Sequence, residues 1–173
     1  MKRRTAIQHI IIIGAGASVL ASCLDKPSVD LKYIPLTGPQ EDLLAAITQT
    51  IIPSTDFVGA KELESHKFLL MMADDCTSPA DQKKFMDGLK QFDEACRKKY
   101  SSVFVKCTPE QREEFLLAVE SKPDFNEDVI GFYQSVKWAT IESFTTSEAY
   151  LTKVKNFSLI PGSFKGCVPV ENV

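Results

Sequence analysis

Apolar residues recur at three- and four-residue spacing through most of the chain after residue 38. This spacing is typical of helices that bury one face. No alternating strand pattern of useful length and no internal repeat interrupts it. The sequence therefore predicts an all-α domain of about five to six helices around one core. The expected helices are Pro39 to Ile52, Lys61 to Ala73, one that starts at Ser78, Thr108 to Pro123, Asn126 to Phe144 and a short Ser147 to Val154.

Capping residues and prolines mark several of the expected ends. Ser78 is a candidate N-cap with Pro79 at the first helical position. Thr108-Pro109-Glu110-Gln111 has the form of a capping box. Pro53 and Pro123 each end a helix, and the tail from Lys155 to Val173 should be irregular. The expected inward stripes are Leu43, Leu44, Ile47 and Ile51; Leu63, Lys67, Leu70 and Met71; Phe85, Leu89, Phe92 and Cys96; Phe115, Leu116 and Val119; and Val129, Phe132, Tyr133, Val136 and Thr140.

Residues 1–22 have the three parts of an export signal. Arg3 and Arg4 lie in a basic start, and an apolar stretch from Ile10 to Leu20 follows. That stretch is shorter than the roughly 20 residues that span a bilayer core. The arginine pair predicts twin-arginine export, and Leu20-Ala21-Ser22-Cys23 is similar to a bacterial lipobox, in which Cys23 would be acylated. An ordinary signal peptide with incidental arginines is the alternative.

The signal imitates one other motif. Ile10 to Ile13 followed by Gly14 and Gly16 is similar to a strand entering a dinucleotide-binding loop. Val19 occupies the place of the third small residue, and Pro27 and Pro35 follow where a helix should continue. We therefore expect this chain to bind no flavin or nicotinamide itself.

Residues 23–38 contain Pro27 and Pro35 and show no sustained apolar period. They are predicted to be a lipidated tether that holds the domain, residues 39–173, off the membrane surface. Removing residues 1–22 from 173 leaves 151, which suits one domain with its own core. This part carries 17 basic and 23 acidic side chains, a formal charge of −6. Such a balance argues against nucleic-acid binding.

Four cysteines remain after Cys23, and an even number in an exported chain favours disulfides. Four cysteines allow three pairings. We favour Cys96 with Cys107, which would close a short loop between two expected helices. That choice leaves Cys76 with Cys167, which would tie the tail to the body.

No set of residues suggests a catalytic or metal site. His66 is the only histidine after the signal, and no serine or cysteine lies near it at a telling spacing. Asp74-Asp75 is expected to be a solvated turn at a helix end. Tyr133 and Trp138 are the best candidates for a partner surface, because aromatic anchors dominate interfaces; burial in the core is the alternative.

The chain resembles the gluconate 2-dehydrogenase subunit 3 family, the small subunits of exported flavin-dependent sugar dehydrogenases. Several stretches carry the resemblance in order, in addition to the twin-arginine start. They are Ile51-Ile52-Pro53-Ser54-Thr55-Asp56 with Gly59-Ala60, Asp74-Asp75-Cys76, Phe85-Met86-Asp87-Gly88-Leu89, Cys107-Thr108-Pro109-Glu110-Gln111, Phe144-Thr145-Thr146-Ser147-Glu148 and Pro161-Gly162-Ser163-Phe164-Lys165-Gly166-Cys167-Val168-Pro169.

The resemblance implies a non-catalytic subunit. In such complexes a large subunit of the glucose-methanol-choline type holds FAD, and a cytochrome c subunit commonly takes the electrons. The small subunit helps the large one mature and leave the cytoplasm, which would place this chain in the periplasm on a lipid anchor. The alternative is a stand-alone periplasmic lipoprotein that binds a ligand or an envelope protein.

Overall fold

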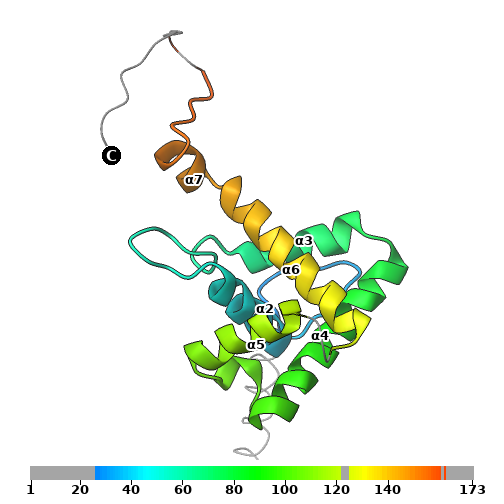
Figure 1. The fold of residues 1–173 in the computed structure, drawn as a ribbon. Coiled ribbons are helices and arrows are strands. Elements are labelled where there is room, and N and C mark those ends of the chain that lie inside the picture. Colours follow the sequence, from blue (N-terminus) through cyan, green and yellow to red (C-terminus); the bar gives the residue numbers. More distant parts are fainter. Residues whose placement is uncertain (1–25, 122–124, 161, 163–173) are drawn as a thin grey trace, which may run out of the picture.

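Six α-helices and one short 3-10 helix form the fold, with no strand among the described residues (Figure 1). The computed structural model describes residues 26–121, 125–160 and 162. The all-α prediction is confirmed. The elements in chain order are α2 (Gly38–Ile51), α3 (Ser65–Cys76), α4 (Pro79–Tyr100), η1 (Phe104–Lys106), α5 (Pro109–Ser121), α6 (Glu127–Thr145) and α7 (Glu148–Lys153).

The central element is α6, which packs against α2, α3, α4 and α5. Figure 1 shows it running across the molecule, with α7 beyond its far end. It packs tightly against α4 at Gly88. A Cβ at that position would lie 2.6 Å from the Cβ of Phe132 and 2.8 Å from the carbonyl oxygen of Asp128. Glycine is therefore what allows these two helices to approach so closely.

Aromatic rings fill the core between α4, η1, α5 and α6. Phe92, Phe104 and Phe115 are fully buried. The Phe92 ring lies 5.1 Å from that of Phe115, nearly perpendicular to it, and 5.6 Å from that of Phe132. These are favourable aromatic geometries, and they add to the free energy gained from burial.

Most helices begin at a side-chain cap, at the position that the sequence predicts. The Ser78 hydroxyl accepts the Asp81 amide, and Asn126 accepts the Val129 amide in the same way. The Thr108–Gln111 capping box is formed in both directions. Because a cap satisfies backbone donors that no helical carbonyl reaches, it fixes the first residue of a helix.

The second expected helix is partly wrong. It begins at Ser65 rather than Lys61, because Glu64 adopts a left-handed conformation with φ of 51°. The buried face consists of His66, Leu69, Leu70 and Ala73, whereas Met71 is 55% exposed. The predicted stripe assumed helical spacing from Leu63 through Lys67 to Met71. A non-helical turn lies between Leu63 and the start of the helix, so this spacing does not apply.

Residues 28–37, here called the strap, lie against the domain instead of forming a free tether. Ile34 and Leu36 are buried, and Val29 and Leu31 pack against the core. The sequence predicts a tether over residues 23–38, and the structure shows that the strap part of it is packed on the domain. Four apolar residues within eight positions supply the burial that holds it down.

Candidate functional site

A buried carboxylate on α3 binds the strap. Both Asp74 oxygens accept backbone hydrogen bonds: one from Lys32 at 2.7 Å, the other from Tyr33 at 2.8 Å and Ile34 at 2.7 Å. Asp74 is buried, so the prediction of a solvated turn is wrong here. Its side chain accepts hydrogen bonds from three consecutive backbone amides that lie about 40 residues earlier in the chain.

The pKa of Asp74 reflects two opposed effects. Burial acts to raise it, but the amides of Lys32, Tyr33 and Ile34 outweigh burial and hold the pKa below its ordinary value. The carboxyl group is therefore ionised at neutral pH. An ionised acceptor makes stronger hydrogen bonds than a neutral one, which strengthens the attachment of the strap.

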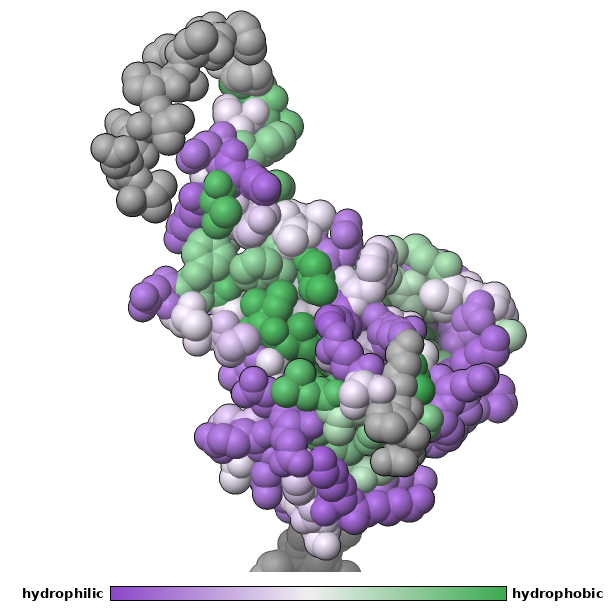
Figure 2. Space-filling view, viewed as in Figure 1, coloured by the Kyte–Doolittle hydropathy of each residue, from purple (hydrophilic) through white to green (hydrophobic). Residues whose placement is uncertain are grey.

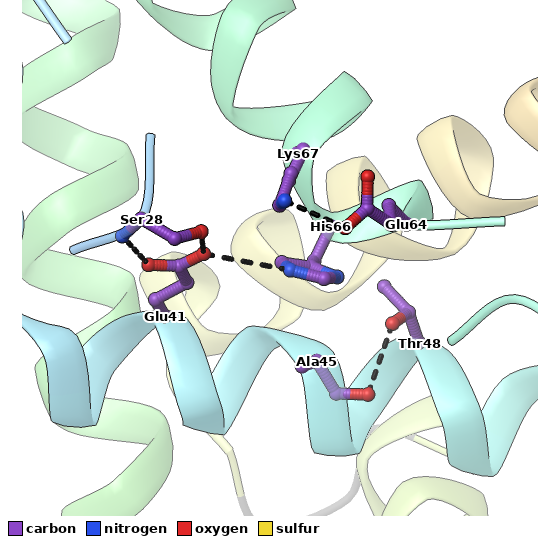
Figure 3. Close-up of polar contacts among 7 residues, drawn as sticks. All are labelled: Ser28, Glu41, Ala45, Thr48, Glu64, His66 and Lys67. Atoms are coloured by element: carbon purple, nitrogen blue, oxygen red, sulfur yellow. Dashed lines mark hydrogen bonds and ion pairs between the residues drawn. The ribbon is translucent and has the colours of Figure 1, made fainter. Parts of the chain in front are cut away.

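A second carboxylate, Glu41 on α2, binds the start of the strap (Figure 3). It accepts the Ser28 amide at 2.5 Å and the Ser28 hydroxyl. On its other side the His66 Nε2 atom of α3 lies 3.6 Å from Glu41 Oε1. Glu41 and His66 are both buried. This cluster of Ser28, Glu41 and His66 joins the strap, α2 and α3.

Burial lowers the pKa of His66, and Glu41 opposes that shift. The second ring nitrogen, Nδ1, is buried and has no hydrogen-bond partner among the described residues. The cluster does not have the arrangement of a nucleophile and its base, because the Ser28 hydroxyl donates to Glu41 and not to the imidazole. The cluster instead holds the start of the strap against α2 and α3.

The favoured disulfide is not present as a bond. The Sγ atoms of Cys96 and Cys107 lie 3.7 Å apart, whereas a disulfide requires about 2.05 Å. Both cysteines are buried, and burial followed by the Cys107 contact raises the pKa of Cys96 to about 12. Cys76 is exposed. Its predicted partner, Cys167, lies outside the described residues.

The two aromatic candidates for a partner surface differ in exposure. Tyr133 is 4% exposed and belongs to the core, which is the alternative for this residue, and it also lines the groove beside α5. Trp138 is 58% exposed on α6. It lines two open grooves, one beside α5 with Val119 and Glu120, and one beside α3 with Leu69 and Met72. Figure 2 shows apolar side chains gathered on the face over α6.

Arg3, Arg4 and Cys23 lie outside the described residues, so export and lipidation are not seen here. Within residues 26–121 and 125–160, no three His, Cys, Asp or Glu side chains gather as metal ligands would. No helix in the described part of the chain combines the length and apolar character needed to cross a membrane.

The structure thus defines a small helical domain whose best-formed polar sites bind the chain's own N-terminal strap. A family model described as gluconate 2-dehydrogenase subunit 3 matches residues 39–162. The match spans most of the chain and includes α3 to α7, and the chain belongs to this family. Searches of curated proteins and of solved structures found no match.

Proposed function

We propose that this chain is the non-catalytic small subunit of an exported, flavin-dependent sugar or sugar-acid dehydrogenase. The observation that carries the proposal is the family match over residues 39–162, since the family name denotes a dehydrogenase subunit. The function is to support maturation of a large glucose-methanol-choline-type subunit, to accompany it through the membrane and to tether it there.

Cofactors belong to the partners in this proposal. FAD would sit in the large subunit, and haem c in a third, cytochrome subunit. Among the described residues, the buried carboxylates of Glu41 and Asp74 accept amides of the strap. The buried acidic groups are therefore committed to holding the chain itself.

Export of a flavoprotein explains why one small chain would carry a twin-arginine signal. A flavin must be inserted in the cytoplasm, so the large subunit has to fold there before it is exported. A single signal at Arg3 and Arg4 can serve two chains if they dock first. Acylation at Cys23 would then keep the complex on the periplasmic face of a membrane.

Replacing Arg3 and Arg4 by lysine tests co-export. Dehydrogenase activity and both subunits should remain in the cytoplasm, measured by fractionation of cells producing the complex. Lys2→Arg is the matched control, because it changes the same basic region without removing the pair. Dehydrogenase that still reached the periplasm in the Arg3→Lys, Arg4→Lys variant would contradict co-export.

Affinity isolation from detergent-solubilised membranes tests the partner. A flavoprotein with the absorbance of bound FAD should accompany the small subunit. Recovery of the small subunit without any flavoprotein would favour the stand-alone lipoprotein. Sugar oxidation by the purified small subunit alone would contradict the non-catalytic assignment.

The Cys96–Cys107 pairing stays a prediction and depends on the export route. Formation of the bond transfers two electrons and two protons from the thiols to a disulfide-carrying oxidant, which becomes a dithiol. Because both thiols are buried and the pKa of Cys96 is about 12, reactive thiolate is scarce once the domain has folded. Export in the folded state should therefore make oxidation slow.

Pulse labelling with thiol alkylation measures this rate. Newly exported chain should keep Cys96 and Cys107 reduced at first. The same chain behind a signal for the unfolded-protein translocon should oxidise them promptly, with Cys96→Ala as the control for band assignment. Equal and immediate oxidation by both routes would argue against folded export.

A further inference from the structure

The docked strap leaves little free chain between the domain and Cys23. Five Cα-to-Cα steps join Cys23 to Ser28, so the reach is at most about 18 Å. A free tether as far as Pro39 would have reached about 58 Å over 16 steps. A folded domain of about 150 residues is roughly 40 Å across. The side of the domain that carries Ser28 must therefore lie close to whatever holds Cys23.

The strap is attached at two points, so its start cannot swing freely. Ser28 is held by Glu41 of α2, and Lys32, Tyr33 and Ile34 are held by Asp74 of α3. The buried Ile34 and Leu36 add apolar packing. The direction in which the N-terminal segment leaves the domain is thus set by the strap and α3.

The outer surface at this place has exposed apolar side chains. Lys67, Met71 and Asp74 follow one another at i+4 and i+3 spacing and so lie along one side of α3. Met71 is 55% exposed, and Tyr33 beside Asp74 is 57% exposed. The Lys32 ammonium lies 4.8 Å from the centre of the Tyr33 ring. We call this surface, defined by Lys32, Tyr33, Lys67 and Met71, the strap face.

The charges around the strap face balance. Leaving out the buried Asp74, the charged residues in this face or next to it in sequence are Lys26, Lys32 and Lys67 against Asp30, Glu64 and Asp75, and Lys67 pairs with Glu64 at 2.6 Å. The face therefore does not select an anionic partner. Tyrosine, an apolar side chain and lysines that can extend to water are residues suited to the boundary between lipid chains and headgroups.

We propose that the strap face rests on the lipid bilayer and that the docked strap fixes the domain in this orientation. The proposal rests on acylation of Cys23, which belongs to the proposed function. The short reach from Cys23 supplies the proximity, and Tyr33 and Met71 supply the apolar contact. The segment beyond α7 follows the C-terminal end of α6 and is not part of the strap face (Figure 1).

Quenching by brominated lipid tests the orientation. The full lipidated chain is purified from membranes and placed in vesicles of phosphatidylcholine brominated on its acyl chains. Trp138 is the only tryptophan, so Trp138→Phe gives a silent background. Met71→Trp reports the strap face. Phe157→Trp, at a position 53% exposed beyond α7, is the matched control.

Emission from position 71 should be quenched, and emission from position 157 should not. Added salt should leave the difference unchanged, because the charges of the face balance. Chain that stays on the vesicles with position 71 unquenched would overturn the inference and leave the anchor intact. Chain absent from the membrane fraction would overturn both the anchor and the inference.

A second variant tests whether the docked strap, and not the lipid anchor alone, sets the orientation. Asp74→Asn removes the carboxylate that binds three strap amides, so the tether lengthens and quenching at position 71 should fall although the chain stays on the membrane. Asp75→Asn changes the exposed neighbour and should keep the quenching. Undiminished quenching in Asp74→Asn, with residues 26–36 newly sensitive to protease, would show that the strap does not set the orientation.

Discussion

Glu41, His66 and Asp74 are titratable side chains that are buried in this small domain. Each of them holds the strap or the helices beneath it. Burying a charge is unfavourable unless hydrogen bonds compensate. Asp74 has that compensation in three amides, and Glu41 has it in Ser28. His66 has only part of it, because its Nδ1 atom has no partner among the described residues.

We expect His66 to make the domain sensitive to mild acid. Its pKa is lowered from the ordinary 6.5, chiefly by burial. Below pH 6.5 the unfolded chain binds a proton that the folded chain does not, so the free energy of unfolding is complete above this pH and falls as the pH drops toward the lower folded pKa. The slope is at most about 1.4 kcal/mol per pH unit.

Urea unfolding of the mature chain at pH values between about 7 and 5.5, a range set by the ordinary histidine pKa, measures this slope. His66→Gln should flatten it, since His66 is the only histidine after the signal. The groups that face His66 are Glu41 on α2, Lys67 on its own helix and Glu64, the residue just before that helix. An unchanged slope in His66→Gln would assign the titration to another group.

The role of Asp74 could not be predicted from its neighbours in sequence. Its three donors lie about 40 residues away, and two adjacent aspartates at a helix end usually face water. A sign was nevertheless present in the strap itself. Val29, Leu31, Ile34 and Leu36 are apolar residues too closely spaced for a solvated linker. Their irregular spacing matched neither a helix nor a strand.

At the scale of elements, helix ends were predictable where capping chemistry is local. The starts of α4, α5 and α6 follow from Ser78, Thr108 and Asn126, each within a few residues of the amides it binds. The start of α3 could not be predicted. It depends on the left-handed conformation of Glu64, and glutamate is not a residue type that favours this conformation. Three residues of η1 are too few to show a period.

Packing between α4 and α6 should depend on Gly88. Gly88→Ala places a Cβ against Phe132 and the Asp128 carbonyl, and should lower the free energy of unfolding by about 1–3 kcal/mol. Gly131→Ala on α6 meets no atom within 4 Å and should raise it by up to about 1 kcal/mol through helix propensity. Urea unfolding of both variants gives the comparison. Equal stabilities would contradict the close approach.

At the scale of the whole molecule, α6 is both the centre of the fold and the bearer of an exposed tryptophan. Its inner face packs against four helices, while Trp138 lies between two open grooves. Beyond α7, Phe157, Leu159 and Ile160 are also exposed. The sequence pattern marked Tyr133 and Trp138 alike as aromatic. Only the rotation of α6 against its neighbours decides which of them faces out.

In the proposed complex, we expect Trp138 to anchor the large subunit. Trp138→Ala should weaken binding to the purified flavoprotein about tenfold or more, which corresponds to 1.4 kcal/mol. Leu117→Ala on α5 is the control, because Leu117 is 60% exposed, close to the 58% of Trp138, and lines neither groove. Titration calorimetry measures both. Equal affinities for the two variants would place the docking surface elsewhere.

The strap also has a consequence in time. Among the described residues it is the first part that the ribosome releases, yet its acceptors follow 13 residues later at Glu41 and about 40 residues later at Asp74. Until α2 and α3 have been made and folded, the strap has no place to bind. The earliest described segment to be synthesised therefore settles only after α2 and α3, and its docking shows that these two helices are in place.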